Sequence, residues 1–254
     1  MTDLKDMGLK YKMLWDHHTH TTYSHGKGSI LDNVRRAHER GLQSVAITDH
    51  GPGNFFYGMK MDRIPEMRAD IEEAAKHYPD VKVLLGVEAN TVLRSPYLDI
   101  ADDEWDQFDI VLAGFHFAVF KSGMIPNRLG LKSQSLLVQN TDMILNTLYH
   151  AEECGHHIEI LSHPGDKGPF DIPEIARACE QTGTLLEING KHPHLTAEEI
   201  REAEPFDVRF VISSDAHLPQ FVGEFRPQLA RALRAGLDPE RIVNIAKTEE
   251  GEWT

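Results

Sequence analysis

Apolar, β-branched runs alternate with segments of helical periodicity along almost the whole sequence. Seven of the runs are predicted to be strands, near residues 12–16, 44–48, 83–87, 109–114, 158–162, 184–188 and 208–213. Six segments between them are predicted to be helices, near residues 29–40, 65–77, 133–153, 172–181, 197–203 and 228–235. This alternation is typical of βα units around a parallel sheet. The pattern therefore predicts an α/β fold.

Residues at the expected helix ends agree with this interpretation. Ser29 is suited to cap the first helix, and glycines follow several others, at positions 41, 155, 183 and 236. The connection between residues 88 and 109 has no helical pattern, so we expect the third and fourth strands to be joined irregularly. Two long loops, over residues 51–64 and 117–132, are expected to be functional, as long loops in compact domains often are.

Length and composition narrow the class of protein. With 254 residues, 41% of them hydrophobic, the chain can bury one large core, and we expect a single domain over residues 1–254. The sequence shows neither a secretion signal nor an apolar run long enough for a membrane span, so we expect a cytoplasmic protein. Cys154 and Cys179 are interpreted as small buried apolar residues.

The formal net charge of -14 disfavours a long nucleic acid as a partner, because its phosphates would be repelled. A small phosphorylated substrate remains compatible with this charge if metal ions dominate the local field. Oligomeric state is not predicted by the sequence.

Metal-ligating residue types follow one predicted strand after another, and only the sixth strand lacks one. They are His18, His20, His50, Glu88, His116, His163, Asp215 and His217. Because the carboxyl ends of parallel barrel strands meet at one face, we expect these side chains to share a pocket. His116 and His163 could each be core histidines when taken singly, and it is their repeated placement that favours ligands.

The spacing of these residues adds chemical detail. His18 and His20, like Asp215 and His217, are two positions apart and point to the same side of an extended chain. Glu88 closes an apolar strand, where a carboxylate has to be paired or bound to metal, and it is suited to bridge two ions. Mixed nitrogen and oxygen donors suit zinc, manganese or iron.

Three further positions stay open at this level. Asp49 could cap a loop or orient an imidazole. His25 lies in an apparent turn, where a lone histidine is more often solvated than coordinating. The second HxH triplet, from His192 to His194, is expected to be an ordinary surface loop, since 15 histidines make such triplets common by chance.

Taken together, the motifs resemble those of the PHP (polymerase and histidinol phosphatase) superfamily. They appear in order as DHHTHTTYSHG, ITDHG, GVEAN, FH, SHPG and SDAH. The resemblance covers nearly the whole chain. It implies a distorted (β/α)7 TIM-like barrel and a small phosphoesterase with a site for two or three divalent ions, here zinc, manganese or iron.

The resemblance also implies how the ions are held. One ion would bind His18, His20, Glu88 and Asp215, and a second would share Glu88 and bind His116 and His163. A third would bind His25, His50 and His217. Many members carry aspartate where this chain has His25, and His17 replaces the usual apolar residue, so we place His17 outside the site.

The predicted reaction is hydrolysis of a phosphate ester by a metal-activated hydroxide. We assign the chemistry to Glu88, Asp215 and His116, with Asp215 or a neighbouring imidazole carrying the proton to the leaving group. Substrate phosphate would also need basic residues. The candidates are Lys60, Arg63, Arg94, Lys121, Arg128, Lys191 and Arg226, of which we select Lys191 and Arg226.

Three alternatives remain at this point. Histidinol phosphatase is the specific activity that the resemblance suggests first. An amidohydrolase would also begin with HxH on the first strand, but it usually adds a bridging lysine, and no lysine closes a predicted strand here. A noncatalytic metal-binding module would keep the ions without turnover.

Overall fold

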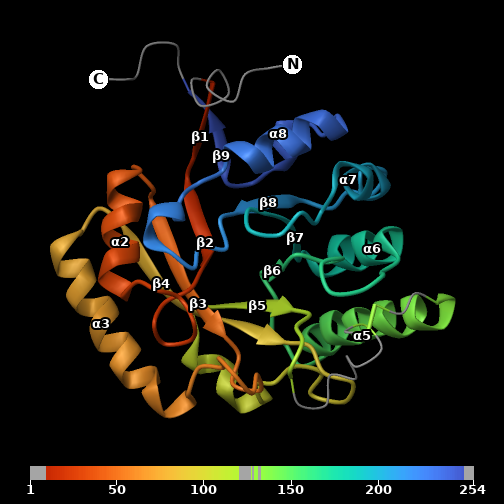
Figure 1. Ribbon diagram of the computed structural model, residues 1–254, viewed down its shortest axis with the longest axis horizontal. Helices are drawn as coiled ribbons and strands as arrows, with labels where there is room; N and C mark the ends of the chain where they lie inside the picture. The colour runs from red at the N-terminus through yellow and green to blue at the C-terminus, as the bar shows by residue number, and fades with distance from the viewer. Residues whose placement is uncertain (1–9, 120–126, 128, 131–132, 249–254) are drawn as a thin grey trace.

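The structure is a computed structural model that describes residues 10–119, 127, 129–130 and 133–248. At its centre lies a seven-stranded parallel sheet in the order β2-β3-β4-β5-β6-β7-β8 (Figure 1). These strands are β2 (Trp15–Thr19), β3 (Ser44–His50), β4 (Lys82–Asn90), β5 (Ile110–Gly114), β6 (Ile160–Leu161), β7 (Leu185–Asn189) and β8 (Phe210–Ser213). Each strand pairs with the next one along the chain, as consecutive βα units require.

The sheet curls until its two edges nearly meet. Thr19 at the end of β2 forms a bridge with Ala216 after β8, and the His20 amide donates to the Ala216 carbonyl at 2.9 Å. Because this seam is a bridge and not a full ladder, the barrel is distorted. The predicted distorted (β/α)7 barrel is thus confirmed.

Helices surround the sheet (Figure 1). They are α2 (Ile30–Glu39), α3 (Ile64–His77), α5 (Gln134–Glu153), α6 (Ile172–Thr182), α7 (Ala197–Ala203) and α8 (Arg226–Ala235). Short 3-10 turns η1 (Met61–Arg63), η2 (Asp102–Gln107), η3 (Pro219–Phe221) and η4 (Pro239–Arg241) lie between them. Only η2 lies in the connection from β4 to β5, which confirms the predicted irregular link. None of the described helices combines the length and the apolar character needed to cross a membrane.

The first predicted strand, over residues 12–16, was placed wrongly. The chain forms two strands there, β1 (Tyr11–Met13) and β2, and only β2 belongs to the barrel. β1 pairs antiparallel with β9 (Ile245–Lys247), which the sequence analysis did not predict. A pairing between the two ends of the chain leaves no trace in local periodicity, because each strand is only three residues long.

The predicted helix ends have a clear local cause. Ser29 Oγ accepts from the Asp32 amide at 3.1 Å, and Asp32 Oδ2 accepts from the Ser29 amide at 3.0 Å, which together form a capping box on α2. Gly183 ends α6 with φ at 71°, a left-handed conformation that glycine adopts without a Cβ clash.

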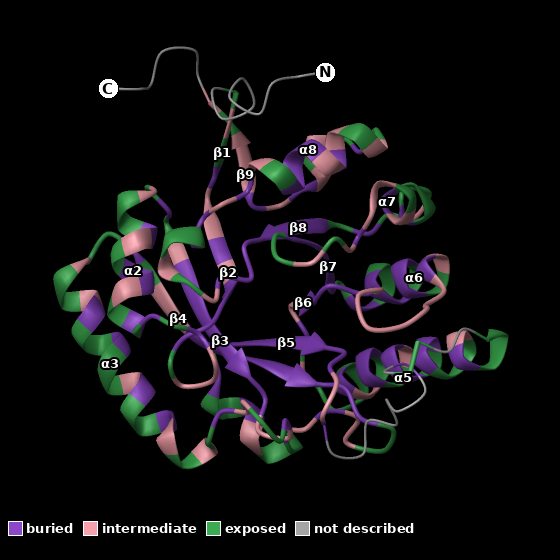
Figure 2. Ribbon diagram, viewed as in Figure 1, coloured by how far each residue is buried: buried purple, intermediate pink, exposed green. Residues whose placement is uncertain are grey.

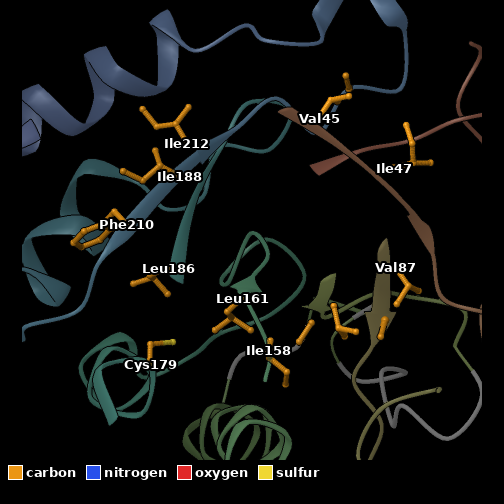
Figure 3. Close-up of a cluster of buried hydrophobic side chains, with 14 of the residues drawn as sticks. Val45, Ile47, Val87, Ile158, Leu161, Cys179, Leu186, Ile188, Phe210 and Ile212 are labelled. Carbon is orange, nitrogen blue, oxygen red and sulfur yellow. The ribbon is translucent and has the colours of Figure 1, made fainter. Parts of the chain in front are cut away.

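Side chains alternate between the two faces of the sheet. Those on the outer face pack against the helices and form the main core, part of which Figure 3 shows around Val45, Ile47, Leu186 and Ile212. Those on the inner face fill the barrel with a second, smaller cluster centred on residues such as Leu112. In Figure 2 the strands of the sheet are largely buried, whereas buried and exposed residues alternate along the helices. The inner face turns polar toward the carboxyl ends of the strands.

The two cysteines differ in their surroundings. Cys179 is buried in α6, as predicted, whereas Cys154 at the end of α5 is exposed, so its predicted burial was wrong. Helix periodicity alone cannot place a residue at the very end of a helix, because the packing of the next loop decides its exposure.

Truncating the barrel interior should destabilise the fold. Leu112 is fully buried in the inner cluster, and Leu112→Ala is expected to lower the free energy of unfolding by about 2–5 kcal/mol, through lost burial and an unfilled cavity. Leu31 on α2 is 40% exposed, and Leu31→Ala should change it by less than about 0.5 kcal/mol. Urea denaturation measures both, and equal losses would contradict this account of the interior.

Candidate metal centre

Glu88 lies at the centre of the polar rim. It is fully buried near the end of β4, and Ser162 Oγ donates to its Oε1 at 2.6 Å. Five imidazoles approach its two carboxylate oxygens, at 3.4 Å for His18, 3.6 Å for His20, 2.9 Å for His50, 3.3 Å for His116 and 2.9 Å for His163. Glu88 and these five histidines lie on β2, β3 and β4 or just after β2, β5 and β6, so five strands contribute to the cluster.

Asp215 lies on the opposite side of His18 and His20. Its Oδ1 is 3.1 Å from His20 Nε2, 3.8 Å from His18 Nε2 and 3.2 Å from His217 Nδ1. Asp215 has φ at 50°, and His163 has φ at 29°, both in the left-handed region that non-glycine residues rarely adopt. Such strain costs about 1–3 kcal/mol at each residue and clusters at functional sites.

His25 also joins the cluster, although its loop position made it uncertain. Its ring centroid is 4.2 Å from that of His217 and 4.9 Å from that of His50. Asp49 holds this loop in place by accepting bonds from the Thr21 amide at 2.8 Å and from the Thr21 and Ser24 hydroxyls at 2.5 Å each. Asp49 therefore braces the loop, the first of its two predicted roles. All nine predicted ligands meet at one rim.

Two residues that orient imidazoles were missed in the sequence. Glu187, fully buried in β7, accepts from His18 Nδ1 at 2.7 Å and from the His163 amide at 2.7 Å. Asn90 Oδ1 lies 2.8 Å from His116 Nδ1. Both leave the Nε2 atoms of these histidines directed at Glu88. The sixth predicted strand, which the sequence analysis left without a metal-ligating residue at its end, therefore supplies Glu187 as an orienting residue, and an acidic residue inside an apolar strand was the available signal.

The second HxH triplet was only partly understood. His192 is half-buried and its Nε2 lies 3.5 Å from Asp215 Oδ2, so the predicted surface loop was wrong for this residue. His194 pairs with Glu199 at 2.8 Å, away from the cluster. His17, predicted to lie outside, stacks on Trp15 at 4.1 Å and bonds Ser44 Oγ at 2.8 Å.

The two selected basic residues lie in different surroundings. Lys191 Nζ is 3.0 Å from His217 Nε2 and 4.0 Å from Asp215 Oδ1. Arg226 lies 3.7 Å from Glu224 and over the Phe225 ring, and none of its described contacts reaches a predicted ligand. Two other basic candidates, Lys121 and Arg128, lie outside the described residues.

The donor atoms fit divalent cations. His50 Nε2, Glu88 Oε2 and Asp215 Oδ1 are buried without a hydrogen-bond partner among the described residues, and a buried lone pair left unpaired costs about 1–3 kcal/mol. Ligands on one tetrahedral zinc ion lie roughly 3.3 Å apart, close to several distances given above. At this rim four sets of three donors lie within 4.8 Å of one another, namely His18/His20/Asp215, His20/His50/His217, His50/Glu88/His116 and His163/His192/Asp215.

These sets overlap, so donor distances alone do not divide the ligands among ions. His50 is grouped with Glu88 and His116 as well as with His217, whereas the resemblance implies a set with His25 and His217. The set of His18, His20 and Asp215 agrees with the implied first ion. His20, His50 and Asp215 each belong to two of these sets, so the donors form one compact cluster.

Comparison with known proteins settles the family. The family model described as "PHP domain" matches residues 16–191, more than half of the chain. The chain belongs to the PHP family. A PHP-family relative from Shewanella sediminis, named a probable phosphatase, is 30% identical over 92% of this chain and 90% of its own length. Another, from Thermoanaerobacter sp. (strain X514), is named a probable phosphatase and is 27% identical over 94% of each chain.

Solved structures share the PHP fold. The histidinol phosphate phosphatase from Lactococcus lactis, solved with zinc, L-histidinol and phosphate, aligns with a TM-score of 0.59 at 15% identity, over 89% of this chain and 95% of that one. The hisK protein from Listeria monocytogenes aligns with a TM-score of 0.57 at 16% identity, over 83% of this chain and 97% of that one. At these identities the likeness concerns the fold.

Charges in this PHP site are strongly coupled. Burial raises the pKa of Glu88, but nearby His116 and His18 outweigh it, and the pKa lies well below its ordinary value. Burial likewise raises the pKa of Asp215, and His18 and His20 outweigh it in the same way. Both carboxylates are therefore anionic at neutral pH, as metal ligands have to be.

The imidazoles divide into two kinds. Burial lowers the pKa of His50 to about 3 and that of His25 to about 4, so both rings are neutral at pH 7. Burial also lowers the pKa of His18, but the carboxylates of Glu187 and Glu88 outweigh it and raise the pKa well above 6.5. In the metal-free protein His18 thus carries a proton that a bound cation has to displace.

Zinc binding to the metal-free protein should therefore release protons at pH 7. Because the raised pKa of His18 keeps its ring protonated at this pH, zinc affinity should rise as pH increases toward that pKa. Isothermal titration calorimetry in two buffers of different ionisation enthalpy measures the release. His38→Ala, which removes an exposed histidine paired with Asp80, should leave it unchanged. Zinc binding without proton release would contradict the charge assigned to His18.

Proposed function

We propose that this protein is a metal-dependent phosphatase that hydrolyses a small phosphorylated substrate. The observation that carries the proposal is the gathering of nine donor side chains around Glu88 and Asp215 at one rim of a PHP-family barrel. Relatives that align over most of the chain and are named probable phosphatases support phosphate ester hydrolysis. Barrel enzymes place their active sites at this face.

Two or three divalent ions would be held by this cluster. We assign His18, His20, Glu88 and Asp215 to one ion, Glu88, His116 and His163 to a second, and His25, His50 and His217 to a third. The nitrogen and oxygen donors suit zinc, manganese or iron, and zinc is present in the related Lactococcus lactis structure. Bound ions would activate water and stabilise the negative charge that develops on phosphate oxygens.

Protein side chains would prepare the site for these ions. Glu88 would bridge two of them, since its two oxygens face different imidazoles. Asn90 would hold His116 with Nε2 directed inward. Asp215 or a neighbouring imidazole would take up the proton released from the attacking water and pass it to the leaving group, and His20 and His217 hold the Asp215 carboxylate in place for this.

Lys191 is the better of the two proposed phosphate contacts. Its ammonium lies beside His217 and Asp215, at the exposed side of the cluster. A phosphate oxygen beyond the reach of the ions would accept a charged hydrogen bond there. Arg226 is engaged by Glu224, which leaves it a weaker candidate.

A cavity of about 320 Å³ beside the cluster suits the organic part of the substrate. Asp215, His217 and Lys191 line one part of it, and the remaining wall includes Leu218, Phe221 and Pro227. Ligand pockets range from about 300 to 1,000 Å³, so this cavity fits a small leaving group with an apolar surface. The net charge of -14 argues against a long nucleic acid in the same place.

Two general features complete the proposal. We place the protein in the cytoplasm, where its two unpaired cysteines would stay reduced. We also propose that residues 1–254 form one domain, since a single barrel accounts for all the described strands except the β1 and β9 pair.

Replacing the proposed bridging ligand should remove both metal and activity. Glu88→Gln and His116→Ala are expected to lower phosphatase turnover by at least about 100-fold and to bind fewer ions, because a ligand or its charge is lost. Glu198→Gln, on a side chain that is 78% exposed, is the matched control and should match the parent. Elemental analysis and hydrolysis of p-nitrophenyl phosphate are the measurements. Full metal content and activity in both site variants would refute the assignment.

Lys191→Ala should weaken phosphate binding without loss of metal. We expect kcat/KM to fall by about 10- to 100-fold, since charged hydrogen bonds contribute about 1.5–3 kcal/mol, with unchanged metal content. Arg226→Ala, which removes a similar charge already paired with Glu224, should stay within about twofold of the parent. Steady-state kinetics compare the two, and a larger loss in Arg226→Ala would reverse their roles.

The same assays separate the alternative functions. Turnover of histidinol phosphate far above that of other phosphate esters would specify a histidinol phosphatase. Hydrolysis of amides in place of esters would indicate an amidohydrolase. Bound metal without hydrolysis of any ester would indicate a noncatalytic module.

A further inference from the structure

The two histidines of the second HxH triplet have separate environments. His194 Nδ1 lies 2.8 and 2.9 Å from the two carboxylate oxygens of Glu199, at the start of α7. His192 instead extends toward the metal centre, with 18% of its side chain exposed. Period-two spacing in this loop thus does not place both rings on one side. The different positions of the two rings call for separate explanations.

His192 directs one ring nitrogen at each of two carboxylates. Nδ1 lies 3.1 Å from Asp166 Oδ2, and Nε2 lies 3.5 Å from Asp215 Oδ2. The His192 and His163 ring centroids are 4.8 Å apart in an edge-to-face arrangement. Donor atoms of His163, His192 and Asp215 all lie within 4.8 Å of one another. The inward nitrogen of His192 therefore shares a small volume with two proposed ligands.

Two of the proposed ligands have the same arrangement, with Nδ1 bonded to an outer oxygen and Nε2 directed into the cluster. His18 places Nδ1 2.7 Å from Glu187 and Nε2 3.1 Å from His20 Nε2. His116 places Nδ1 2.8 Å from Asn90 and Nε2 3.3 Å from Glu88. A ring nitrogen that donates to an outer oxygen leaves the other nitrogen as a lone-pair donor, the usual arrangement of metal-bound histidines. His192 with Asp166 follows this arrangement.

Charge on Asp166 is compatible with this role. Burial opposes its ionisation, but hydrogen bonds with His192 and Lys167 outweigh burial, so the pKa of Asp166 lies below its ordinary value. Asp166 is therefore an anion that accepts a hydrogen bond from Nδ1–H of His192. That hydrogen bond selects the tautomer whose Nε2 is free to coordinate.

The backbone around His192 is held from several sides. Asn189 Oδ1 accepts from the Lys191 and His192 amides, each at 2.8 Å. Arg231 donates to the carbonyls of Asn189, His192 and Pro193. These hydrogen bonds fix the turn before any ion binds. Little conformational entropy of the backbone would therefore be lost when His192 binds an ion.

The neighbouring SHPG turn packs closely on the same loop. A Cβ on Gly165 would come within 2.6 Å of His194 Nδ1, so a larger residue would push the loop away. Asp166, which follows Gly165, reaches His192 because of this approach. The turn after β6 and the loop after β7 thus form one unit, consistent with the pairing of these two strands.

We infer that His192 is a further metal ligand of this site, with its Nε2 beside Asp215 of the proposed first ion and His163 of the proposed second, and that Asp166 is its positioning residue. The inference rests on the proposed metal centre and extends it by a tenth side chain. An ion at this edge would be a borderline cation such as zinc, manganese or iron, which accept imidazole and carboxylate together. His192 lies outside the sequence motifs that supplied the nine predicted ligands.

Metal binding by variants of the triplet tests this inference. His192→Ala and His192→Gln should each lose one ion per chain or bind the most weakly held zinc ion about 10- to 100-fold less tightly. Asp166→Asn should weaken the same ion by a smaller factor, about 10-fold. His194→Ala, the neighbour in the same triplet, should retain the parent's metal content and affinity. Zinc affinity is measured by competition with a chelating dye on the metal-free protein, and stoichiometry by elemental analysis.

Cobalt substitution gives a second readout that does not depend on turnover. Loading the metal-free protein with cobalt(II) should give visible absorption bands that change in His192→Ala and stay unchanged in His194→Ala. Circular dichroism of the metal-free proteins shows whether each variant is folded, and the glutamine variant keeps a polar side chain in place.

The outcomes separate this inference from the proposed function. Suppose that the parent binds ions and hydrolyses phosphate esters, and that His192→Ala and His192→Gln keep its metal content, zinc affinity and cobalt spectrum. The inference about His192 is then overturned, and the proposed function still stands. A raised KM with unchanged metal binding would overturn it in favour of a contact between His192 and substrate phosphate. If the parent itself binds no ions, the proposed function fails together with it.

Discussion

The burial of Glu88 is the constraint on which the rest of the site depends. A carboxylate taken fully out of water has to be compensated by positive charge or by donors, or it would be neutralised. Here five imidazoles and the Ser162 hydroxyl surround it. The charge of nearby imidazoles keeps the Glu88 carboxylate anionic. Some buried lone pairs in the cluster, such as that of Asp215 Oδ1, still have no hydrogen-bond partner among the described residues. Divalent cations satisfy both demands at once.

The barrel provides this environment because its strands run parallel and in register. His50 on β3 pairs with Glu88 on β4, and Glu88 with Leu112 on β5, so neighbouring strand ends reach the same level. Below that level the interior is apolar, and above it the chain turns outward into loops. Left-handed backbone at His163 and Asp215 aims two of the side chains back into the rim. The strand ends thus set the level of the rim, and the segments that follow them carry most of the predicted ligands.

Residues outside the nine motif positions give the cluster its order. Glu187 and Asn90 select which nitrogen of His18 and His116 faces inward, and Asp49 turns the loop with His25 over the site. Metal affinity commonly depends on such outer contacts nearly as much as on the ligands themselves. The loop after β7 contributes in a second way, because it carries both His192 and Lys191 to the exposed side of the cluster.

The sequence by itself determined the alternation of strands and helices and the residue types at the strand ends, because periods of 2 and 3.6 are local properties of the chain. The local patterns predicted an α/β fold and eight residues at the strand ends, and the resemblance to the PHP motifs added His25 and the distorted barrel. Only the tertiary structure decided the β1 and β9 pair, the inward position of Glu187, the separate positions of His192 and His194, and the different surroundings of Lys191 and Arg226. Each of these depends on contacts between segments distant in the chain, and such contacts leave no periodic signal in either segment alone.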